Sequence, residues 1–311
     1  MKIYENLFRD GYILVKNALN LPSNIEEIFD IASETCTGKS LRNWDGLSST
    51  PSATMGVEKD INIAKVLEKT NLQPLIDAFM GTNIKFWGSD LSTFDKSSQW
   101  HKDVACEVPI YKIAIYLDGS YGKDQTFLVV PGSHHINDKY AKLLNKYLLW
   151  PNGGGINENG FNNIYNFENN EWKKTLNTVQ LQVDRGDIII FDQRIIHTAL
   201  SDNVRRLIAL SFIPEYEDAI EMWAGITPKP QSSQEYYNYL FKLRCAMRKV
   251  ESPRFINYQS THQKLPFLET TWKKYAFFNR WQENDYIDGV KSFFPGENGI
   301  IKAMNVINAK G

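Results

Sequence analysis

Short apolar segments recur through the middle of the chain, and each has the length and composition of a β-strand. Turn residues separate them, notably the Pro-Gly-Ser-His sequence at 131–134 and the Arg-Gly-Asp sequence at 185–187. Many short strands divided by turns are typical of an all-β barrel or jelly roll rather than of alternating strands and helices. The sequence therefore predicts a mainly β fold, with strands at 84–87, 111–117, 127–130, 179–183, 188–191 and 207–213.

Helical patterns precede this β region. Ser23 is a candidate cap for a helix that runs to about Ala32. A second helix is expected over residues 61–80, closed by Gly81. The other N-terminal expectations are a short helix within residues 1–20, a strand at 12–15, and a loop over the Ser-, Thr- and Gly-rich residues 38–58.

The pattern also divides the chain. Residues 136–178 interrupt the strands, and an insertion of that length in a sheet domain is more often a functional lid than an accident. After Pro214 the pattern turns helical, most clearly over 236–250. We therefore expect a β domain over residues 1–215 with a lid-like insertion at 136–178. Residues 216–311 are expected to form a mainly helical extension packed on the barrel, through which a homodimer could assemble.

The strongest chemical signal is the His101-Lys102-Asp103 sequence, taken together with His197 downstream. A His and an Asp two residues apart on an extended segment project from the same face. A second His from a later strand would complete two imidazoles and one carboxylate, the set that suits non-haem Fe(II) with open positions for oxygen chemistry. The alternative is a pair of ordinary hydrogen-bonded histidines.

Basic residues near this set are candidate ligands for an organic co-substrate. Arg205, eight residues after His197, could clamp a carboxylate through two hydrogen bonds, and Arg206 is the fallback because a one-residue shift turns a strand side chain to the other face. A solvated basic strand edge is the alternative for this pair. Lys112 and Tyr116 share one strand face and are pocket candidates if it points inward. Otherwise Lys112 is a surface side chain.

Composition narrows the class of protein. The formal charge of −1 gives no electrostatic case for binding nucleic acid or an anionic membrane. Neither a secretory signal nor an apolar stretch of about 20 residues is seen. The three cysteines, Cys36, Cys106 and Cys245, fit no zinc spacing and are expected to be free thiols. A cytoplasmic protein is expected.

Residues 8–212 resemble the phytanoyl-CoA dioxygenase family of Fe(II)/2-oxoglutarate-dependent oxygenases. The resemblance is carried by an ordered set of motifs rather than by one tripeptide. It comprises the opening segment 8–15, the Trp-His-Lys-Asp sequence at 100–103, the strand pair and turn at 116–118 and 128–134, and the Gly-Asp strand at 186–191 with His197.

The resemblance implies a double-stranded β-helix, a cupin-like jelly roll, with iron at its mouth. His101, Asp103 and His197 would bind Fe(II), and 2-oxoglutarate would chelate the metal and place its far carboxylate on Arg205. It also implies that the turn histidines His134 and His135 are structural; His262, without a partner pattern, is expected at the surface or in the tail.

Two departures from the family pattern concern the co-substrate. The family often has a hydroxyl residue two positions after the distal His, where this chain has Ala199. Thr198 or Ser201 is a candidate substitute. The Asn-Gly usually found before the central Leu-Val-Val-Pro strand is replaced by Gln125-Thr126.

The reaction class follows from the carboxylate. Related halogenases lack this metal-binding carboxylate, so that chloride can bind iron in its place, whereas this chain keeps Asp103. The expected reaction is hydroxylation of an aliphatic C–H bond in a small polar molecule, either free or tethered to a carrier, with O2 consumed and succinate and CO2 released. The alternatives are a cupin-type metalloprotein that catalyses isomerisation or hydrolysis, and a non-catalytic binding module.

Overall fold

The computed structural model describes most of the chain up to residue 240. The described residues are 3–35, 40–41, 52–55, 61–80, 84–94, 102–104, 106–118, 126–135, 178–200, 204–223, 228–236 and 239–240. His101, Ser201, His262, Cys36, Cys245 and Gln125 lie outside them, as do nearly all of the predicted insertion and most of the C-terminal extension. The division into a β domain and an extension therefore stays a prediction.

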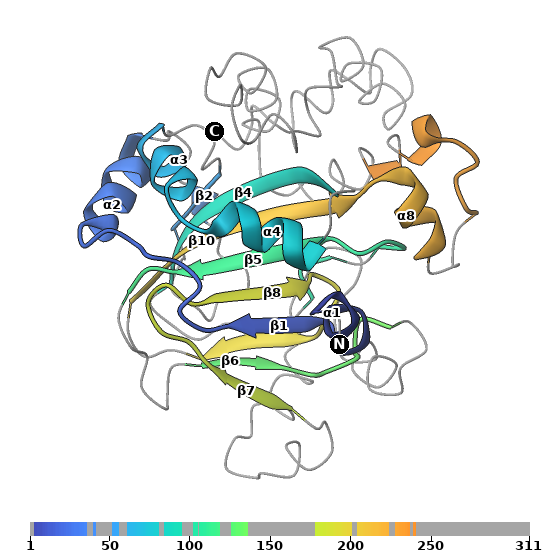
Figure 1. Ribbon diagram of the computed structural model, residues 1–311, viewed down its shortest axis with the longest axis horizontal. Helices are drawn as coiled ribbons and strands as arrows, with labels where there is room; N and C mark the ends of the chain where they lie inside the picture. Colours follow the sequence, from blue (N-terminus) through green and yellow to red (C-terminus); the bar gives the residue numbers. More distant parts are fainter. Residues whose placement is uncertain are drawn as a thin grey trace.

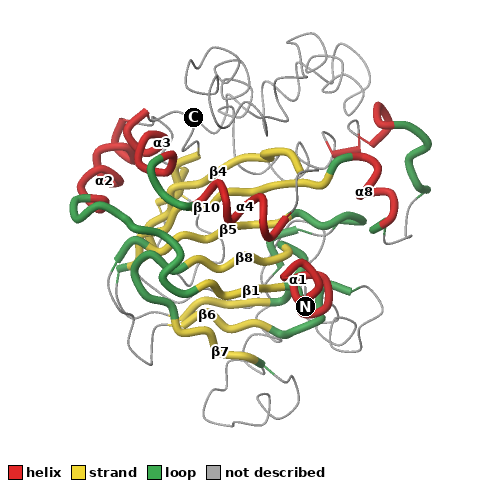
Figure 2. The backbone as a smooth tube through the Cα atoms, viewed as in Figure 1, coloured by secondary structure: helices red, strands yellow, loops and turns green. Residues whose placement is uncertain are grey.

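Two antiparallel sheets form the body of the molecule (Figures 1 and 2), which confirms the predicted mainly β, jelly-roll class. The larger sheet has the order β1-β8-β5-β10-β4-β3-β2, and the smaller has the order β7-β6-β9. The strands are β1 (Tyr12–Val15), β2 (Ser40–Leu41), β3 (Ser52–Met55), β4 (Ile84–Phe94), β5 (Tyr111–Tyr116), β6 (Thr126–Val129), β7 (Val179–Gln182), β8 (Ile188–Asp192), β9 (His197–Leu200) and β10 (Arg205–Pro214).

Helices cover one face of the larger sheet, where α4 crosses in front of β10 and β5 (Figure 1). The apolar side chains of this face, such as Ile113, Ile190 and Ile208, form one core cluster with helical residues such as Phe29. Burial of these side chains is the main source of stability for both layers. The helices are α1 (Ile3–Asp10), α2 (Ile25–Thr35), α3 (Ile61–Glu68), α4 (Leu72–Met80) and, beyond β10, α8 (Tyr216–Glu221).

The opposite face of the larger sheet packs against the smaller sheet. Strand side chains alternate, so Ala114, Tyr116 and Phe191 of the larger sheet point inward, where they form a second core cluster with Phe127 and Val129 of β6. We call this space between the two sheets the interior. A residue of β10 reaches the interior only at odd numbers, because Leu207 pairs with Tyr116 and Ala209 pairs with Ala114.

The predicted helix over 61–80 is two helices, so the prediction of a single element was wrong. The first ends at Glu68 and the second begins at Leu72, with Pro74 in its first turn. Proline lacks an N–H group and is tolerated only near a helix start. The Thr70 hydroxyl oxygen accepts a hydrogen bond from the Leu72 N–H (3.3 Å) and donates one to the Leu67 carbonyl (2.7 Å), which supports the break.

Two further local predictions need correction. Part of the predicted loop over 38–58 forms β2 and β3, because β3 pairs with the edge of the long strand β4 and gains its hydrogen bonds there. The metal motif was expected on an extended strand, yet its described residues 102–104 lie in a bend after β4. Tertiary hydrogen bonds thus override local composition at both places.

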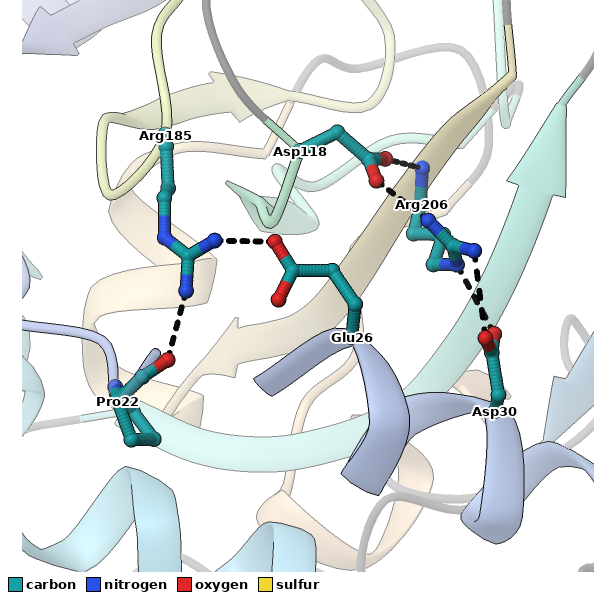
Figure 3. Close-up of polar contacts among 6 residues, drawn as sticks. All are labelled: Pro22, Glu26, Asp30, Asp118, Arg185 and Arg206. Atoms are coloured by element: carbon teal, nitrogen blue, oxygen red, sulfur yellow. Dashed lines mark hydrogen bonds and ion pairs between the residues drawn. The ribbon is translucent and has the colours of Figure 1, made fainter. Parts of the chain in front are cut away.

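Ion pairs connect α2 to one end of the larger sheet, as Figure 3 shows. The Arg206 guanidinium donates to both Asp30 of α2 (2.9 Å) and Asp118 (2.6 Å). Arg185, in the turn before β8, pairs with Glu26 one helical turn earlier on the same helix face. The contacts fix the register between α2 and the sheet.

The Pro-Gly-Ser-His turn docks against the end of α1, as the structural interpretation of its histidines predicts. His134 is 5% exposed, and its Nε2 lies 2.8 Å from the Phe8 carbonyl oxygen. The Ser133 hydroxyl accepts a hydrogen bond from the Ile196 N–H (2.8 Å), the residue before His197. The turn therefore ties α1 to the start of β9.

The described part of the chain contains no helix that is long and apolar enough to span a bilayer. Cys106 is a free thiol that donates to the Val108 carbonyl, and burial raises its pKa to about 12. A thiol with that pKa is poorly reactive at neutral pH, because the thiolate is the nucleophile.

We predict that Gly11→Ala destabilises the protein more than Gly132→Ala does. Both glycines have positive φ (+83° and +76°), but a Cβ at Gly11 would lie 2.5 Å from His134 Nδ1 and 2.9 Å from Ile195 Cδ1. At Gly132 the nearest atom is 3.8 Å away. Backbone strain alone costs about 1–2 kcal/mol, and crowding adds about 1–3 kcal/mol at Gly11. Urea denaturation measures both, and equal losses would contradict the crowding argument.

Acidification should destabilise the fold through His134. Burial lowers its pKa to about 4, against the opposing charge of Asp192, whereas an unfolded histidine titrates near 6.5. Between pH 6.5 and 4 the unfolded chain takes up a proton that the folded chain does not, so the free energy of unfolding falls as pH falls, by about 3 kcal/mol in total. Urea denaturation across this range should show a shallower slope for His134→Gln, whose amide can still donate to Phe8. Identical slopes would refute the assignment.

Candidate metal centre

His197 begins β9 and faces the interior, opposite Val129 of β6. It is 3% exposed, and its ring contacts those of Phe127 (5.1 Å between centroids) and Phe191 (5.0 Å), which also contact each other (5.3 Å). Its Nδ1 lies 3.0 Å from the Ile195 carbonyl oxygen. A carbonyl only accepts, so Nδ1 is the donor in this contact, and Nε2 is the ring nitrogen on the Asp103 side, from which a histidine held in this way would bind a metal.

Asp103 is placed by the turn that also delivers His197. Its N–H donates to the Gln193 carbonyl oxygen (2.9 Å), which also accepts from Val104 (3.3 Å). Gln193 in turn donates through its N–H to Ile110 (2.8 Å) and through its side chain to Ser211 of β10 (2.8 Å). Sequence reasoning missed Gln193, because no spacing or residue type indicates that a turn carbonyl will hold a segment 90 positions earlier.

The Asp103 carboxylate faces His197. Its Oδ1 lies 3.6 Å from His197 Nε2, and its Oδ2 accepts from the Lys112 ammonium. Lys112 therefore points inward, not to the surface, and its charge has a carboxylate partner, as burial requires. Its Nζ also lies 5.8 Å from the centre of the Phe191 ring.

This pair of side chains fits one edge of a metal site. Neighbouring ligands of an octahedral ion with bonds of about 2.1 Å lie about 3 Å apart, close to the separation of Oδ1 and Nε2. Among the residues described, no group of three or more potential ligands occurs, since His101, the third of the predicted set, lies outside them. An imidazole nitrogen with a carboxylate oxygen is a donor set that suits Fe(II).

The two arginines at the start of β10 lie on opposite faces of the sheet. Arg205 is 3% exposed and has the odd-numbered, interior position beside Tyr116. Burial raises the pKa of Tyr116, and the positive charge of Arg205 partly offsets that rise. Arg206 has the helix-covered position, where Asp30 and Asp118 hold its guanidinium (Figure 3). The geometry thus places Arg205, the candidate that the sequence favoured, in the interior and the fallback Arg206 on the opposite face.

Thr198 was a candidate to replace the missing hydroxyl residue. It pairs with Leu128 and is fully buried, but alternation places it on the opposite face of β9 from His197. Ala199 is the β9 residue that shares the interior with His197, and it packs against the apolar cluster there. Two described hydroxyl residues of that face, Tyr116 of β5 and Ser92 of β4, pair with Leu207, two positions from Arg205.

Charged side chains therefore occur at two separate ends of the interior. Asp103, Lys112 and His197 meet at one end, and Arg205 lies beside Tyr116 at the other. Lys112 and Tyr116 are four residues apart on β5, a rise of about 13 Å. Between them, Ala114 pairs with Ala209 across the strands, so small side chains line this part of the face.

The chain is similar in fold to the solved structure of the epimerase SnoN, which supports the jelly-roll assignment. The epimerase SnoN in complex with Fe3+, alpha ketoglutarate and nogalamycin RO is 13% identical, with a TM-score of 0.50 over 69% of this chain and 83% of SnoN. The carbocyclase SnoK from nogalamycin biosynthesis is 14% identical, with a TM-score of 0.49 over 69% and 83% of the two chains. EctD from S. alaskensis with 2-oxoglutarate and 5-hydroxyectoine is 13% identical, with a TM-score of 0.47 over 74% and 85%.

At these identities the likeness concerns the fold. No curated protein sequence matches the chain. The model of the phytanoyl-CoA dioxygenase family, whose members use Fe(II), 2-oxoglutarate and O2, matches residues 7–206. That range includes the described candidate site residues Asp103, Lys112, His197 and Arg205, and it spans well over half of the 311 residues. This chain belongs to the phytanoyl-CoA dioxygenase family.

Proposed function

We propose that this protein is an Fe(II)/2-oxoglutarate-dependent oxygenase that hydroxylates an aliphatic C–H bond of a small polar molecule and releases succinate and CO2. The observation that carries the proposal is the buried pairing of Asp103 and His197, with Nε2 of the histidine presented to the carboxylate at 3.6 Å. Nδ1 of His197 contacts the Ile195 carbonyl, so Nε2 and the Asp103 carboxylate face each other as two ligands of one metal would.

The proposed metal ligands are His101, Asp103 and His197. The bound metal and 2-oxoglutarate would supply the oxidising chemistry, and the protein's part is to hold them, orient the substrate and exclude water. The rings of Phe127 and Phe191 shield His197 from solvent. Arg205 is proposed to hold the far carboxylate of 2-oxoglutarate, because it is the buried cation of the interior face at the end away from Asp103.

Family members do not all hydroxylate. SnoN is named an epimerase and SnoK a carbocyclase. Substrate screening should therefore follow succinate, which reports 2-oxoglutarate turnover whichever product forms. Hydroxylation is the proposed outcome because Asp103 keeps its carboxylate, in contrast to the halogenase pattern.

We predict that His197→Ala abolishes the visible charge-transfer band that forms when Fe(II) and 2-oxoglutarate bind together. Loss of a ligand should weaken Fe(II) binding by more than about 100-fold, since loss of an outer hydrogen-bond partner alone costs 10–100-fold. Anaerobic titration of the metal-free protein measures both effects. His135→Ala is the matched control, because the His135 ring makes an edge contact with Phe8 of α1. A band that persists in His197→Ala would refute the ligand assignment, and wild-type protein without any band would favour a different cupin chemistry.

Arg205 and Arg206 should respond in opposite ways to truncation. Arg205→Ala should weaken 2-oxoglutarate binding to the Fe(II) protein by about 100-fold, because a buried charged pair is worth about 2–5 kcal/mol. Arg206→Ala should leave that affinity within about threefold and instead lower the free energy of unfolding by about 1 kcal/mol, through loss of the contacts to Asp30 and Asp118. Band titration and urea denaturation give the two values, and the reverse ranking would place the clamp at Arg206.

A further inference from the structure

The two oxygens of the Asp103 carboxylate have different partners. Oδ1 lies 3.6 Å from Nε2 of His197, on the side where the proposed metal would bind. Oδ2 accepts from the ammonium of Lys112. The carboxylate is therefore oriented, with one oxygen offered to the metal side and the other occupied.

Lys112 is well placed to hold that orientation. It lies on β5, in the middle of the larger sheet, where it pairs with Ser211 of β10 on one side and Phe191 of β8 on the other. The Lys112 side chain is 19% exposed and that of Asp103 is 16% exposed, so solvent screens the pair only weakly. Within the described ranges, Asp103 is the carboxylate that pairs with this ammonium.

The main chain of Asp103 is held independently. Its N–H donates to the Gln193 carbonyl oxygen, and Gln193 is itself bonded to Ile110 and to Ser211. Backbone and carboxylate are thus fixed from two directions, by the turn before β9 and by β5. A residue held only by its backbone could still rotate its carboxylate to present both oxygens to a cation.

The number of oxygens that coordinate matters for the chemistry of the proposed site. Two histidines and one carboxylate oxygen leave three of six octahedral positions open. Chelation by 2-oxoglutarate requires two of them, and O2 requires the third. A carboxylate that coordinated through both oxygens would occupy one of these positions and compete with the co-substrate.

We propose that Lys112 is a positioning residue that holds Oδ2 of Asp103, so that the carboxylate coordinates the metal through Oδ1 alone and a position stays open for 2-oxoglutarate. This inference rests on the proposed function. It gives Lys112 a role toward the ligand Asp103, distinct from the co-substrate contact that its place in the interior first suggested.

The direct test is an anaerobic crystal structure of the wild-type protein loaded with Co(II), an air-stable substitute for Fe(II). One Asp103 oxygen should lie on the metal and the other should remain on Lys112. Asp103 bound through both oxygens, or a Lys112 that points away from it, would overturn the proposal without any variant.

Variants add a test in solution. Lys112→Met keeps the length of the side chain and removes its charge and its donors, so both Asp103 oxygens should coordinate Co(II), and 2-oxoglutarate should bind the Fe(II) protein at least about 10-fold more weakly. Lys112→Arg keeps a charged donor and should stay within about threefold of the wild type. Lys65→Met, the same change on the exposed face of α3, is the matched control and should have no effect.

The possible outcomes are distinguishable. Wild-type protein that binds neither Co(II) nor Fe(II) with 2-oxoglutarate would refute the proposed function itself. A Lys112→Met protein with unchanged 2-oxoglutarate affinity and single-oxygen coordination would refute only the role of Lys112. Weakened 2-oxoglutarate binding with coordination still through one oxygen would also refute it, because Lys112 would then contact the co-substrate directly.

Discussion

The alternation of side chains across the larger sheet is the constraint on which the site depends. Every central strand sends one set of residues to the helices and the other to the interior. On β10 this assigns Ile208 and Leu210 to the helix-covered core and Arg205 to the interior. A shift of one residue would exchange the two arginines and would leave Arg206 without Asp30 and Asp118. The ion pairs on the outer face thus help to fix which arginine reaches the interior.

Two carboxylates in the β fold that is otherwise strongly apolar have a basic partner. Asp103 is paired with Lys112, and the buried Asp192 is paired with Arg194 (2.7 Å) in the turn between β8 and β9. Burial alone would raise the pKa of Asp192, but the Arg194 charge and hydrogen bonds hold it below its ordinary value. These pairs add little net stability, because desolvation offsets their attraction. Their consequence is a defined geometry in the turn that carries His197.

Local sequence predicted most elements, because strands buried on both faces are almost continuously apolar and the turns carry glycine, proline and aspartate. The strand of residues 188–191 is an example, since it lies between β1 and β5 in the larger sheet with every side chain buried. Predictions failed where a long-range contact decided the outcome. Ser52–Met55 became a strand because it meets the edge of β4, and Asp103 left the extended conformation because Gln193 holds its N–H. Neither partner is marked by any local pattern.

The sequence by itself determined the jelly-roll class, the family motifs and the identity of the candidate ligands Asp103 and His197, because those properties depend on residue type and on short-range periodicity. Only the tertiary structure decided which oxygen of Asp103 faces His197, that Lys112 occupies the other, and that Arg205 rather than Arg206 enters the interior. Those choices depend on strand register and on contacts between residues from 9 positions apart (Asp103 and Lys112) to 94 positions apart (Asp103 and His197), which local side-chain preferences do not encode.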